Sequence, residues 1–446
     1  MRDDSVRWLT AGDPQAHAAS LSTRFAEVFR RRAHGVWFAP GRANLNGEHI
    51  DFHGGRCLPM ALEHGTYAAA APRTDNRLRL RTLDPDLDTG ILEAAVDDTT
   101  QDFTAGLDGA PGWVAYVWGV LWAMRRLREE HPELALDQGF GADVLIRSTL
   151  PIGAGLSSSA SLECAAALAF TALGTPVGRA SPGTSLTSGL SDEQRAVLAR
   201  ACVRAEVEVV GAGTGGLDQN TSLRAAEGNL LSLDCRDFSL THTDTSSLLR
   251  DHRFLAVDTG QPHVLATSDF TARRAESEAA ASVLGVRRLR DALPEHPSAP
   301  DVARVLEKYD AAANAATLGG ADPQACRRRL VHALNEMLRS EALHGLLTEG
   351  RSTVQETVEV VGRTMTAGHA SMRDDAEVSF PLADRVVETG LAHGAAGARL
   401  IGGGFGGSVL MLLPREALEE LAAATSRLSP AIRFLDVKPS SAAAAL

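Results

Sequence analysis

The sequence predicts an α+β fold divided into two domains. At 446 residues the chain is longer than one hydrophobic core normally supports, so two domains are expected. Segments with helical and with strand composition occur along the chain without strict alternation, which argues against a doubly wound parallel sheet. A glycine-rich turn also runs directly into a helix, as in phosphate-binding sites. We expect the first domain to cover residues 20–215 and the second to cover 216–446.

The expected elements of the first domain follow in order. Residues 17–33 have the spacing of an amphipathic helix, and Val36 to Pro40 form a short strand that enters a polar loop. β-Branched or alternating runs predict strands at 66–72, 78–82 and 143–147. Residues 113–129 form a helix, and we expect its tryptophans in the core rather than at a ligand: Trp113, Trp118 and Trp122.

The second half has more helices and two irregular segments. Residues 174–191, rich in Gly, Ser, Thr and Pro, are expected to form a mobile surface loop, and residues 291–300 a second irregular stretch. The domain junction falls near 215–225, after a helix that ends at Val210. Beyond it we expect a strand, then helices, then a tight hairpin at 398–413.

Charge and cysteine content narrow the class of protein. The net charge is −12 and no basic tract occurs, which argues against nucleic acid or an anionic membrane as a partner. The five cysteines are scattered and never in C-x-x-C spacing, so we expect buried free thiols and a reducing compartment. No stretch approaches the roughly 20 apolar residues of a membrane span. A cytoplasmic location follows, while the oligomeric state stays open.

Residues 151–161, Pro-Ile-Gly-Ala-Gly-Leu-Ser-Ser-Ser-Ala-Ser, form the most informative motif. The glycines let the backbone approach a ligand, and the helix that begins among the serines offers free N–H groups to an anion. The chain has only two lysines, Lys308 and Lys438, and no Walker A motif, so backbone and serine groups would hold the phosphate. The predicted ATP- and phosphate-binding residues are Gly153, Gly155, Leu156, Ser157, Ser158, Ser159 and Ala160.

A second motif, residues 39–55, brings arginine, glutamate, histidine and aspartate together between glycines. Carboxylates and imidazoles at this density suit a ligand with several hydroxyl groups, such as a sugar. His49 and His53 have a spacing that could bind zinc on a helix, but the glycines around them argue against a helix there.

Two further glycine-rich segments can be given a role only when the elements on either side of them are considered. Residues 211–220 follow a helix that carries Glu206, and they present Asp218 near the domain junction, where clefts form. An aspartate after glycines is by itself more often a cap or turn residue. The glycines of 402–407 match a dinucleotide fingerprint, but a strand follows them. We therefore expect a hairpin whose glycines pack against another loop.

Taken together, these motifs resemble the galactokinases of the GHMP kinase superfamily. The resemblance covers roughly residues 20–415 and implies the two-domain GHMP kinase fold. The first domain would be S5-like and the second ferredoxin-like, with the active site in the cleft between them. The matching segments are G-R-x-N-L-x-G-E-H-x-D at 41–51, G-L-S-S-S-A-S at 155–161, Leu217-Asp218-Gln219, 233–236, 372–379 and the G-G-G-F-G-G hairpin.

The resemblance implies ATP-dependent phosphorylation of the anomeric C1 hydroxyl of galactose or a related hexose. Asp218 would lie beside that hydroxyl, to remove its proton or to position it, and Arg42 would lie between Asp218 and the γ-phosphate. Mg²⁺ would be held by Ser159 and Glu206. The sugar would contact Glu48, His49, Asp51, Gly215 and Phe270.

The chain departs from the family pattern at five positions: Asn46, Phe52, His53, Phe270 and Ala376. Phe270 and Ala376 stand where the family carries tyrosines, so a polar handle for the sugar is lost. Galactose is the first candidate, and a modified or deoxygenated hexose, or a cyclitol of secondary metabolism, is the second. A non-catalytic sugar sensor is a third, but the intact phosphate loop and Asp218 argue against it. Mevalonate and homoserine kinases lack the G-E-H-x-D segment.

Overall fold

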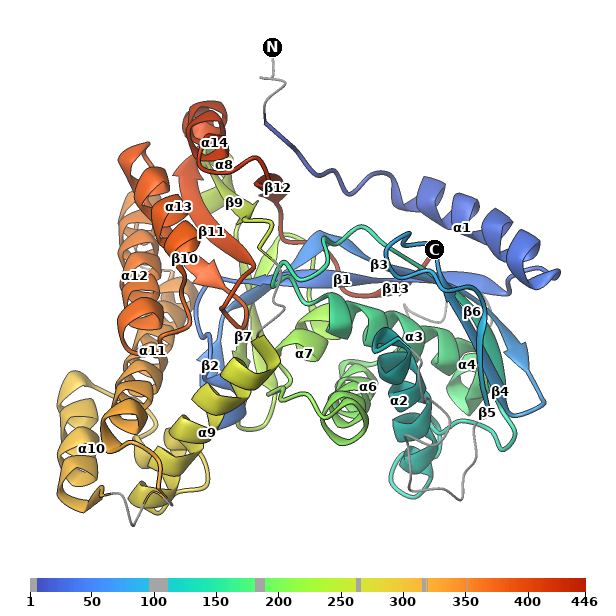
Figure 1. The fold of residues 1–446 in the computed structure, drawn as a ribbon, viewed down its shortest axis with the longest axis horizontal. Coiled ribbons are helices and arrows are strands. Elements are labelled where there is room, and N and C mark those ends of the chain that lie inside the picture. Colours follow the sequence, from blue (N-terminus) through green and yellow to red (C-terminus); the bar gives the residue numbers. More distant parts are fainter. Residues whose placement is uncertain are drawn as a thin grey trace.

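The computed structural model describes residues 6–95, 111–180, 189–261, 266–314, 318, 320–350 and 352–446. Figure 1 shows two long strands, β1 and β3, running across the molecule, with one group of helices beneath them and another at the far end. The predicted α+β class is confirmed by separate sheets of six, four and three strands, each covered by helices.

The first layer is a six-stranded sheet in the order β13-β1-β3-β6-β4-β5. Neighbouring strands are antiparallel, except that β4 runs parallel to β6. The predicted strands at 66–72, 78–82 and 143–147 are confirmed. The strands of this sheet are β1 (Gly35–Asn44), β3 (Pro59–Arg73), β4 (Arg77–Thr82), β5 (Leu92–Ala95), β6 (Gly141–Ser148) and β13 (Ala444–Ala445).

Strand β1 is longer than predicted. A polar loop is expected after Pro40, but the strand continues to Asn44, with Arg42 opposite Ala61 and Asn44 opposite Pro59. The register shifts between Pro40 and Arg42, and an irregularity of this kind bends a strand and redirects the next side chain. Arg42 therefore projects from a rigid strand rather than from a loop.

Helices cover both faces of the first sheet. Leu21 and Phe25 of α1 (Pro14–Phe29) pack with Val36 and Phe38 on one face, and Trp37 points to the other. This alternation is the two-residue period of a strand with two buried faces. On the face to which Trp37 points, Trp118 and Trp122 are buried in the hydrophobic core, as predicted. Trp113 packs against the same core. The helices there are α2 (Trp113–Arg125), α3 (Ser158–Gly174), α4 (Pro176–Ala180), α6 (Asp192–Arg204) and α7 (Leu217–Arg224).

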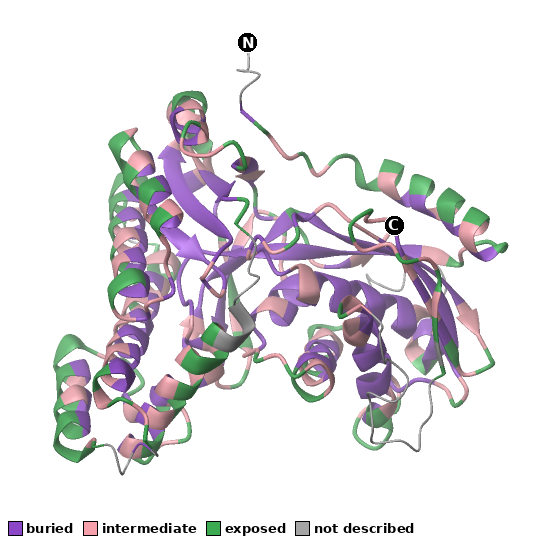
Figure 2. Cartoon of the chain, in the orientation of Figure 1, coloured by how far each residue is buried: buried purple, intermediate pink, exposed green. Residues whose placement is uncertain are grey.

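The second layer is an antiparallel four-stranded sheet in the order β10-β11-β9-β12. Its strands are buried on both faces (Figure 2). The predicted hairpin is confirmed as the β10–β11 pair. The strands are β9 (His252–Asp258), β10 (Gly397–Ile401), β11 (Ser408–Pro414) and β12 (Arg433–Val437). The helices are α8 (Leu248–Asp251), α9 (Ala266–Leu284), α10 (Ala299–Ala312), α11 (Pro323–Glu349), α12 (Val354–Asp374), α13 (Pro381–Ala392) and α14 (Leu418–Ser426).

Several segments cross the division predicted at residues 215 and 216, which stays a prediction. Helix α7 packs on α3 and α6, and the C-terminal strand β13 pairs with β1. A small third sheet joins β2 (Arg56–Cys57) to β7 (Asn229–Asp234) and β8 (Ser239–Asp244). Residues 39–55, called the sugar motif below, are thereby placed against elements from much later in the chain.

The two predicted irregular segments differ in outcome. Within 174–191, residues 176–180 form the helix α4, contrary to prediction, and 181–188 lie outside the described residues. Proline at the first position of a helix needs no N–H donor, so Pro176 starts α4 at no cost. Between a 3₁₀ turn ending at Ala292 and the start of α10 at Ala299, the chain is irregular as predicted.

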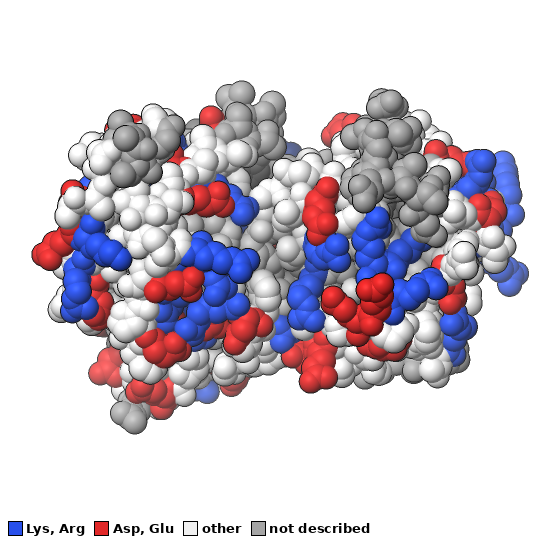
Figure 3. Space-filling view, turned by 90° about the horizontal axis from the view of Figure 1, so that it is seen from below, with Lys and Arg blue, Asp and Glu red and all other residues white. Residues whose placement is uncertain are grey.

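The cysteines, the helices and the surface charge can be compared with what the composition predicts. All five cysteines are free and buried, as predicted. In the part of the chain that the structure describes, no helix has the length and apolarity to cross a membrane. Acidic and basic side chains are interspersed over the face seen in Figure 3.

Candidate active site

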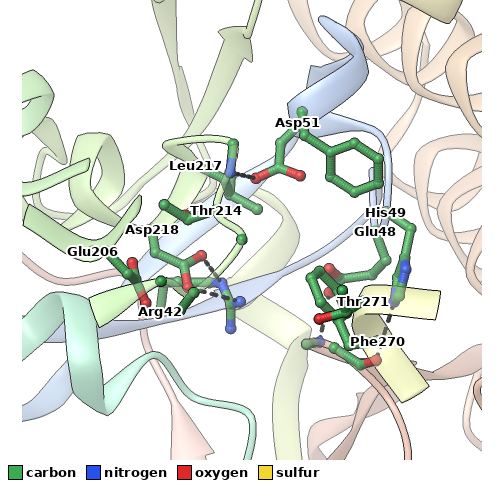
Figure 4. A pocket seen from close by; sticks show the side chains of 17 residues that line it. Arg42, Glu48, His49, Asp51, Glu206, Thr214, Leu217, Asp218, Phe270 and Thr271 are labelled. Carbon is green, nitrogen blue, oxygen red and sulfur yellow. Dashed lines mark hydrogen bonds and ion pairs between the residues drawn. The ribbon is translucent and has the colours of Figure 1, made fainter. Parts of the chain in front are cut away.

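A pocket of about 320 Å³ contains all the predicted catalytic and sugar-binding residues. Figure 4 shows Arg42, Asp218 and Glu206 at one end and Glu48, His49 and Phe270 at the other. The lining also includes residues outside the predicted set of site residues, most of them within the motifs: Phe52, Gly211, Ala212, Gly213, Thr214, Leu217, Thr271, Gly402 and Gly403. Residues 153–160 do not line the pocket but adjoin it through hydrogen bonds to Arg42, Asp218 and Glu206.

The carboxylate of Asp218 is held by three donors. Arg42 donates from Nε to Oδ1 at 2.7 Å and from Nη2 to Oδ2 at 3.2 Å, and the Ser157 hydroxyl donates to Oδ2 at 2.5 Å. Asp218 is the second residue of α7, which begins directly after the left-handed Gly216, so it lies in a helix rather than in the glycine-rich segment before it. Burial opposes the charge on Arg42, but Asp218 and Glu48 raise its pKa above the ordinary value. Arg42 therefore stays a cation beside the carboxylate.

The predicted phosphate loop meets this pair at the start of α3. Arg42 donates from Nη1 to the Gly155 carbonyl at 2.7 Å, and its backbone N–H donates to the Leu156 carbonyl at 3.2 Å. Ser157 has φ +60°, a left-handed conformation that costs energy in a residue with a side chain. The first N–H groups of a helix lack partners within it, and here they begin at Ser158. The N-terminus of α3 therefore lies next to Asp218.

Buried carboxylates surround the catalytic end of the pocket. Glu206 lies in a π-helical turn (Ala205–Val210), and burial, together with the charge on Asp218, raises its pKa to about 7. Gln219 donates from Nε2 to Glu206 at 2.6 Å and to Glu163 at 3.0 Å. Burial raises the pKa of Glu163 well above its usual range. The motifs do not point to Glu163, although it is the single charged residue in the sequence of α3.

The other end of the pocket is polar and tied to the β10–β11 hairpin. Glu48 accepts the Gly402 N–H at 2.9 Å, and His49 Nε2 lies 3.2 Å from the Gly403 carbonyl. A carbonyl only accepts, so Nε2 carries the proton. Burial, and then the nearby His332, lowers the pKa of His49 to about 3, which leaves a neutral ring with an acceptor at Nδ1. The glycines pack as predicted: a Cβ on Gly402 would lie 2.9 Å from the Gly155 carbonyl oxygen.

Asp51 links the sugar motif to the glycine-rich segment before α7. Its Oδ2 accepts the Gly215 N–H at 3.1 Å. A Cβ on Gly215 would lie 2.3 Å from the Phe52 nitrogen and 2.4 Å from Asp51 Cγ, so only glycine fits there. Burial, and then the charge on Asp218, raises the pKa of Asp51. Gly215 lines the pocket through its backbone.

Of the five departures from the family pattern, only Phe52 and Phe270 line the pocket. Their ring centroids lie 6.5 Å apart, and the Phe270 ring is 5.2 Å from that of His49. The Arg274 guanidinium stacks over Phe52 at 4.9 Å. This gives the sugar end an apolar wall. The others face elsewhere: Asn46 bonds to Ser340 and Arg399, His53 to Ser277, and Ala376 lies in the second-layer core.

We expect acid to weaken the fold around the sugar motif through His53. Burial, and then the charge on Arg274, lowers the pKa of His53 to about 3, against about 6.5 in an unfolded chain. The unfolded state therefore binds the proton first, so stability is complete above pH 6.5 and is lost as pH falls toward 3. At pH 5 the loss from this group is about 2 kcal/mol.

Urea unfolding at pH 7 and pH 5 checks this expectation. His53→Asn should lose less stability between the two pH values than the wild type, whereas His296→Asn, at an exposed position, should lose the same amount. Equal losses in the wild type and His53→Asn would show that His53 does not carry the effect.

Comparison with known proteins agrees with this geometry. Three family models match: the galactokinase galactose-binding signature at residues 23–72, the GHMP kinases N terminal domain at 115–225 and the GHMP kinases C terminal at 351–428. A galactokinase of Streptomyces coelicolor is 38% identical over 436 residues, covering 96% of this chain and 98% of the relative. A galactokinase of Canis lupus familiaris is 33% identical over 401 residues, covering 89% and 88%.

Solved structures are also similar to this chain. The crystal structure of Lactococcus lactis galactokinase complexed with galactose has a TM-score of 0.76 at 26% identity, covering 96% of this chain and 99% of that one. Methanococcus jannaschii mevalonate kinase, with a TM-score of 0.56 at 18% identity over 92% of this chain and 99% of that one, shares the fold. Together with the relatives and family models, this establishes that the chain belongs to the galactokinase family of the GHMP kinases.

Proposed function

We infer that this protein transfers the γ-phosphoryl group of ATP to the C1 hydroxyl of galactose. The observation that carries the inference is the position of Asp218. Its carboxylate is held by Arg42 and Ser157 where the phosphate loop meets a pocket whose far end is lined by Glu48 and His49. A phosphate cradle and a polyol site therefore meet at one carboxylate.

Galactose would bind through its hydroxyl groups at the polar end of the pocket. Glu48 and Asp51 offer carboxylate oxygens, and neutral His49 offers an acceptor at Nδ1. Each of these side chains already bonds to a backbone group of the protein, so it loses little conformational freedom when the sugar binds. This fixed arrangement turns C1 toward Asp218 and holds it for in-line attack, which is the main demand of phosphoryl transfer.

Arg42 and Asp218 would act at the reacting hydroxyl. The carboxylate takes a hydrogen bond from the C1 hydroxyl, orients its lone pair and receives the proton as the bond to phosphorus forms. Arg42, a buried cation between Asp218 and the Gly155 carbonyl, spreads the negative charge that develops on the transferred group. Both groups are placed before the substrate arrives.

ATP would bind with its phosphates at the start of α3. The N–H groups after Ser157, and the serine hydroxyls, provide donors without any lysine. The predicted set from Gly153 to Ala160 is the proposed phosphate site. Since Ser157 also bonds to Asp218, the nucleotide and the base are coupled through one side chain.

The residues at this end fit a magnesium ion. Glu163, Glu206 and Asp218 place three acidic side chains near one buried guanidinium, so a cation would relieve their repulsion. Among the described residues no three His, Cys, Asp or Glu side chains converge on one metal position. Mg²⁺ bound with nucleotide commonly takes one or two protein ligands. Ser159 and Glu206 would hold it, and it would neutralise phosphate charge.

The apolar wall favours a second candidate, a hexose that is deoxygenated or substituted where it meets Phe270. We expect Phe270→Tyr to raise kcat/KM for galactose several-fold, because a new hydroxyl supplies one hydrogen bond, worth about 1 kcal/mol. Steady-state kinetics with galactose and with deoxyhexoses would measure the change. A galactose kcat/KM that is unchanged or reduced in Phe270→Tyr would show that this position does not set the sugar preference.

A panel assay tests the proposed function. ADP release with Mg-ATP is measured against hexoses, deoxy and amino sugars, and cyclitols. Galactose should give the highest kcat/KM, and a clear preference for another class would transfer the proposal to that class. A protein that binds galactose and ATP without releasing ADP would instead be a sensor.

A further inference from the structure

A buried charged network lies directly behind the sugar end of the pocket. Arg399 on β10 and Glu336 on α11 are both fully buried, and Nη2 of Arg399 lies 2.8 Å from Oε1 of Glu336. Arg339 donates from Nε to the other oxygen of Glu336 at 2.9 Å. Burying such charges is costly even when they are paired, so the fold gains little stability from them. Neither Arg399 nor Glu336 lines the pocket.

The network ends on the two residues that precede Glu48. Glu336 Oε1 accepts the Gly47 N–H at 2.9 Å, and Arg399 Nη1 donates to Asn46 Oδ1 at 2.7 Å. Asn46 in turn donates from Nδ2 to the Ser340 hydroxyl at 2.8 Å. Side chains of α11 and β10 therefore hold the segment that follows β1.

This segment has a conformation that needs outside support. Gly47 has φ +108° and His49 has φ +61°, the latter a left-handed conformation that a side chain disfavours. Such residues persist where the surrounding structure fixes them. His332, on the same helix as Glu336, adds a hydrogen bond from Nε2 to the Glu48 carbonyl at 3.1 Å.

The pair keeps its charges under ordinary conditions. Burial opposes ionisation of Glu336, but Arg399 and Arg339 outweigh it and hold the pKa of Glu336 well below its usual range. The hydrogen bond from Gly47 adds to this effect. Glu336 is therefore ionised when it accepts the Gly47 N–H, and the Arg399 that it pairs with bonds to Asn46.

We propose that Arg399 and Glu336 are positioning residues for the sugar, which act by holding Asn46 and Gly47 so that Glu48 and His49 face the pocket. The proposal rests on the proposed function, with galactose as the ligand. The phosphate loop contacts Arg42 and Asp218 instead, so the network affects sugar binding more than nucleotide binding. Its loss displaces Glu48 and His49, and small displacements of binding groups have large kinetic effects.

The test uses Glu336→Gln and Arg399→Lys, with Asn46→Ser as a variant that leaves the ion pair intact. Galactose binding is measured by calorimetry without ATP, and kcat and both KM values by ADP release. We expect the galactose Kd and KM to rise about tenfold or more in Glu336→Gln, with ATP KM within about threefold of wild type. Arg399→Lys keeps the charge but not both hydrogen bonds, so its effect should be intermediate.

A matched control separates positioning from general destabilisation. Asp143 is fully buried and paired with Arg79, whose Nε lies 2.6 Å away, on the first sheet and outside the pocket. Asp143→Asn should lower the melting temperature and leave the galactose KM unchanged. Wild-type galactose Kd in the folded Glu336, Arg399 and Asn46 variants would overturn the proposal, as would an equal rise in Asp143→Asn. A wild-type protein that neither binds nor phosphorylates galactose would overturn the proposed function itself, and this proposal with it.

Discussion

Asp218→Asn should reduce kcat by about 10³-fold or more while galactose still binds. General-base groups contribute about 10² to 10⁴ in rate, and here the same carboxylate also orients the nucleophile. Asparagine keeps the size of the side chain, so the fold and the sugar end of the pocket should persist. ADP release gives kcat, and calorimetry without ATP gives the galactose Kd.

Asp218→Ala distinguishes the two roles that Asp218 can have. If Asp218 removes the proton, the Asn and Ala variants should be equally slow, because neither has a base. If it mainly positions the hydroxyl, Asn should retain clearly more activity than Ala. Asp251→Asn, at an exposed position at the end of α8, is the control and should keep wild-type rates. Wild-type kcat in Asp218→Asn would remove Asp218 from the reaction.

Arg42→Lys should reduce kcat by about 10² to 10³-fold, and Arg42→Met by more. Lysine keeps a positive charge, but its single nitrogen cannot reproduce the bonds that Nε, Nη1 and Nη2 of Arg42 make to Asp218 and the Gly155 carbonyl. Donors placed in advance at the developing charge are worth about this much in other enzymes. The galactose Kd should change less than kcat, because Arg42 bonds to Asp218 and the Gly155 carbonyl rather than to Glu48 or His49.

Stability must be followed in the Arg42 variants, because this side chain is only 8% exposed and its removal leaves Asp218 without its counter-charge. Melting temperatures, compared with those of Arg415→Met at an exposed position, separate loss of fold from loss of rate. A folded Arg42→Lys protein with wild-type kcat would contradict the role given to the guanidinium.

The contiguous parts of the site could be predicted from the sequence. Residues 41–51 and 155–161 are each one segment, and their residue types state the chemistry directly. Asp218 lies alone after glycines, and only its place beside the other motifs gives it meaning. The pocket brings all the predicted catalytic and sugar-binding residues together. The residue types of the motifs and their order along the chain are therefore enough to predict these residues of the site.

What the sequence could not give depends on contacts between distant segments. Polar residues after Pro40 look like a loop, but pairing with β3 extends the strand to Asn44. Asn46 and His53 belong to the sugar motif, yet their side chains turn to Arg399 and Ser277, away from the pocket. Glu163 lies in an otherwise apolar helix, and nothing in the sequence shows that Gln219 connects it with Glu206 in the folded protein. Side-chain direction and partners of this kind follow from packing rather than from local pattern.

One measurement tests the central claim most directly. The protein is incubated with Mg-ATP and galactose, and the products are followed by phosphorus and carbon NMR together with ADP release. We predict one ADP per galactose consumed and a phosphate ester coupled to H1 and C1 of the sugar. ADP formation without a sugar phosphate, or a phosphate on another carbon such as C6, would contradict the account.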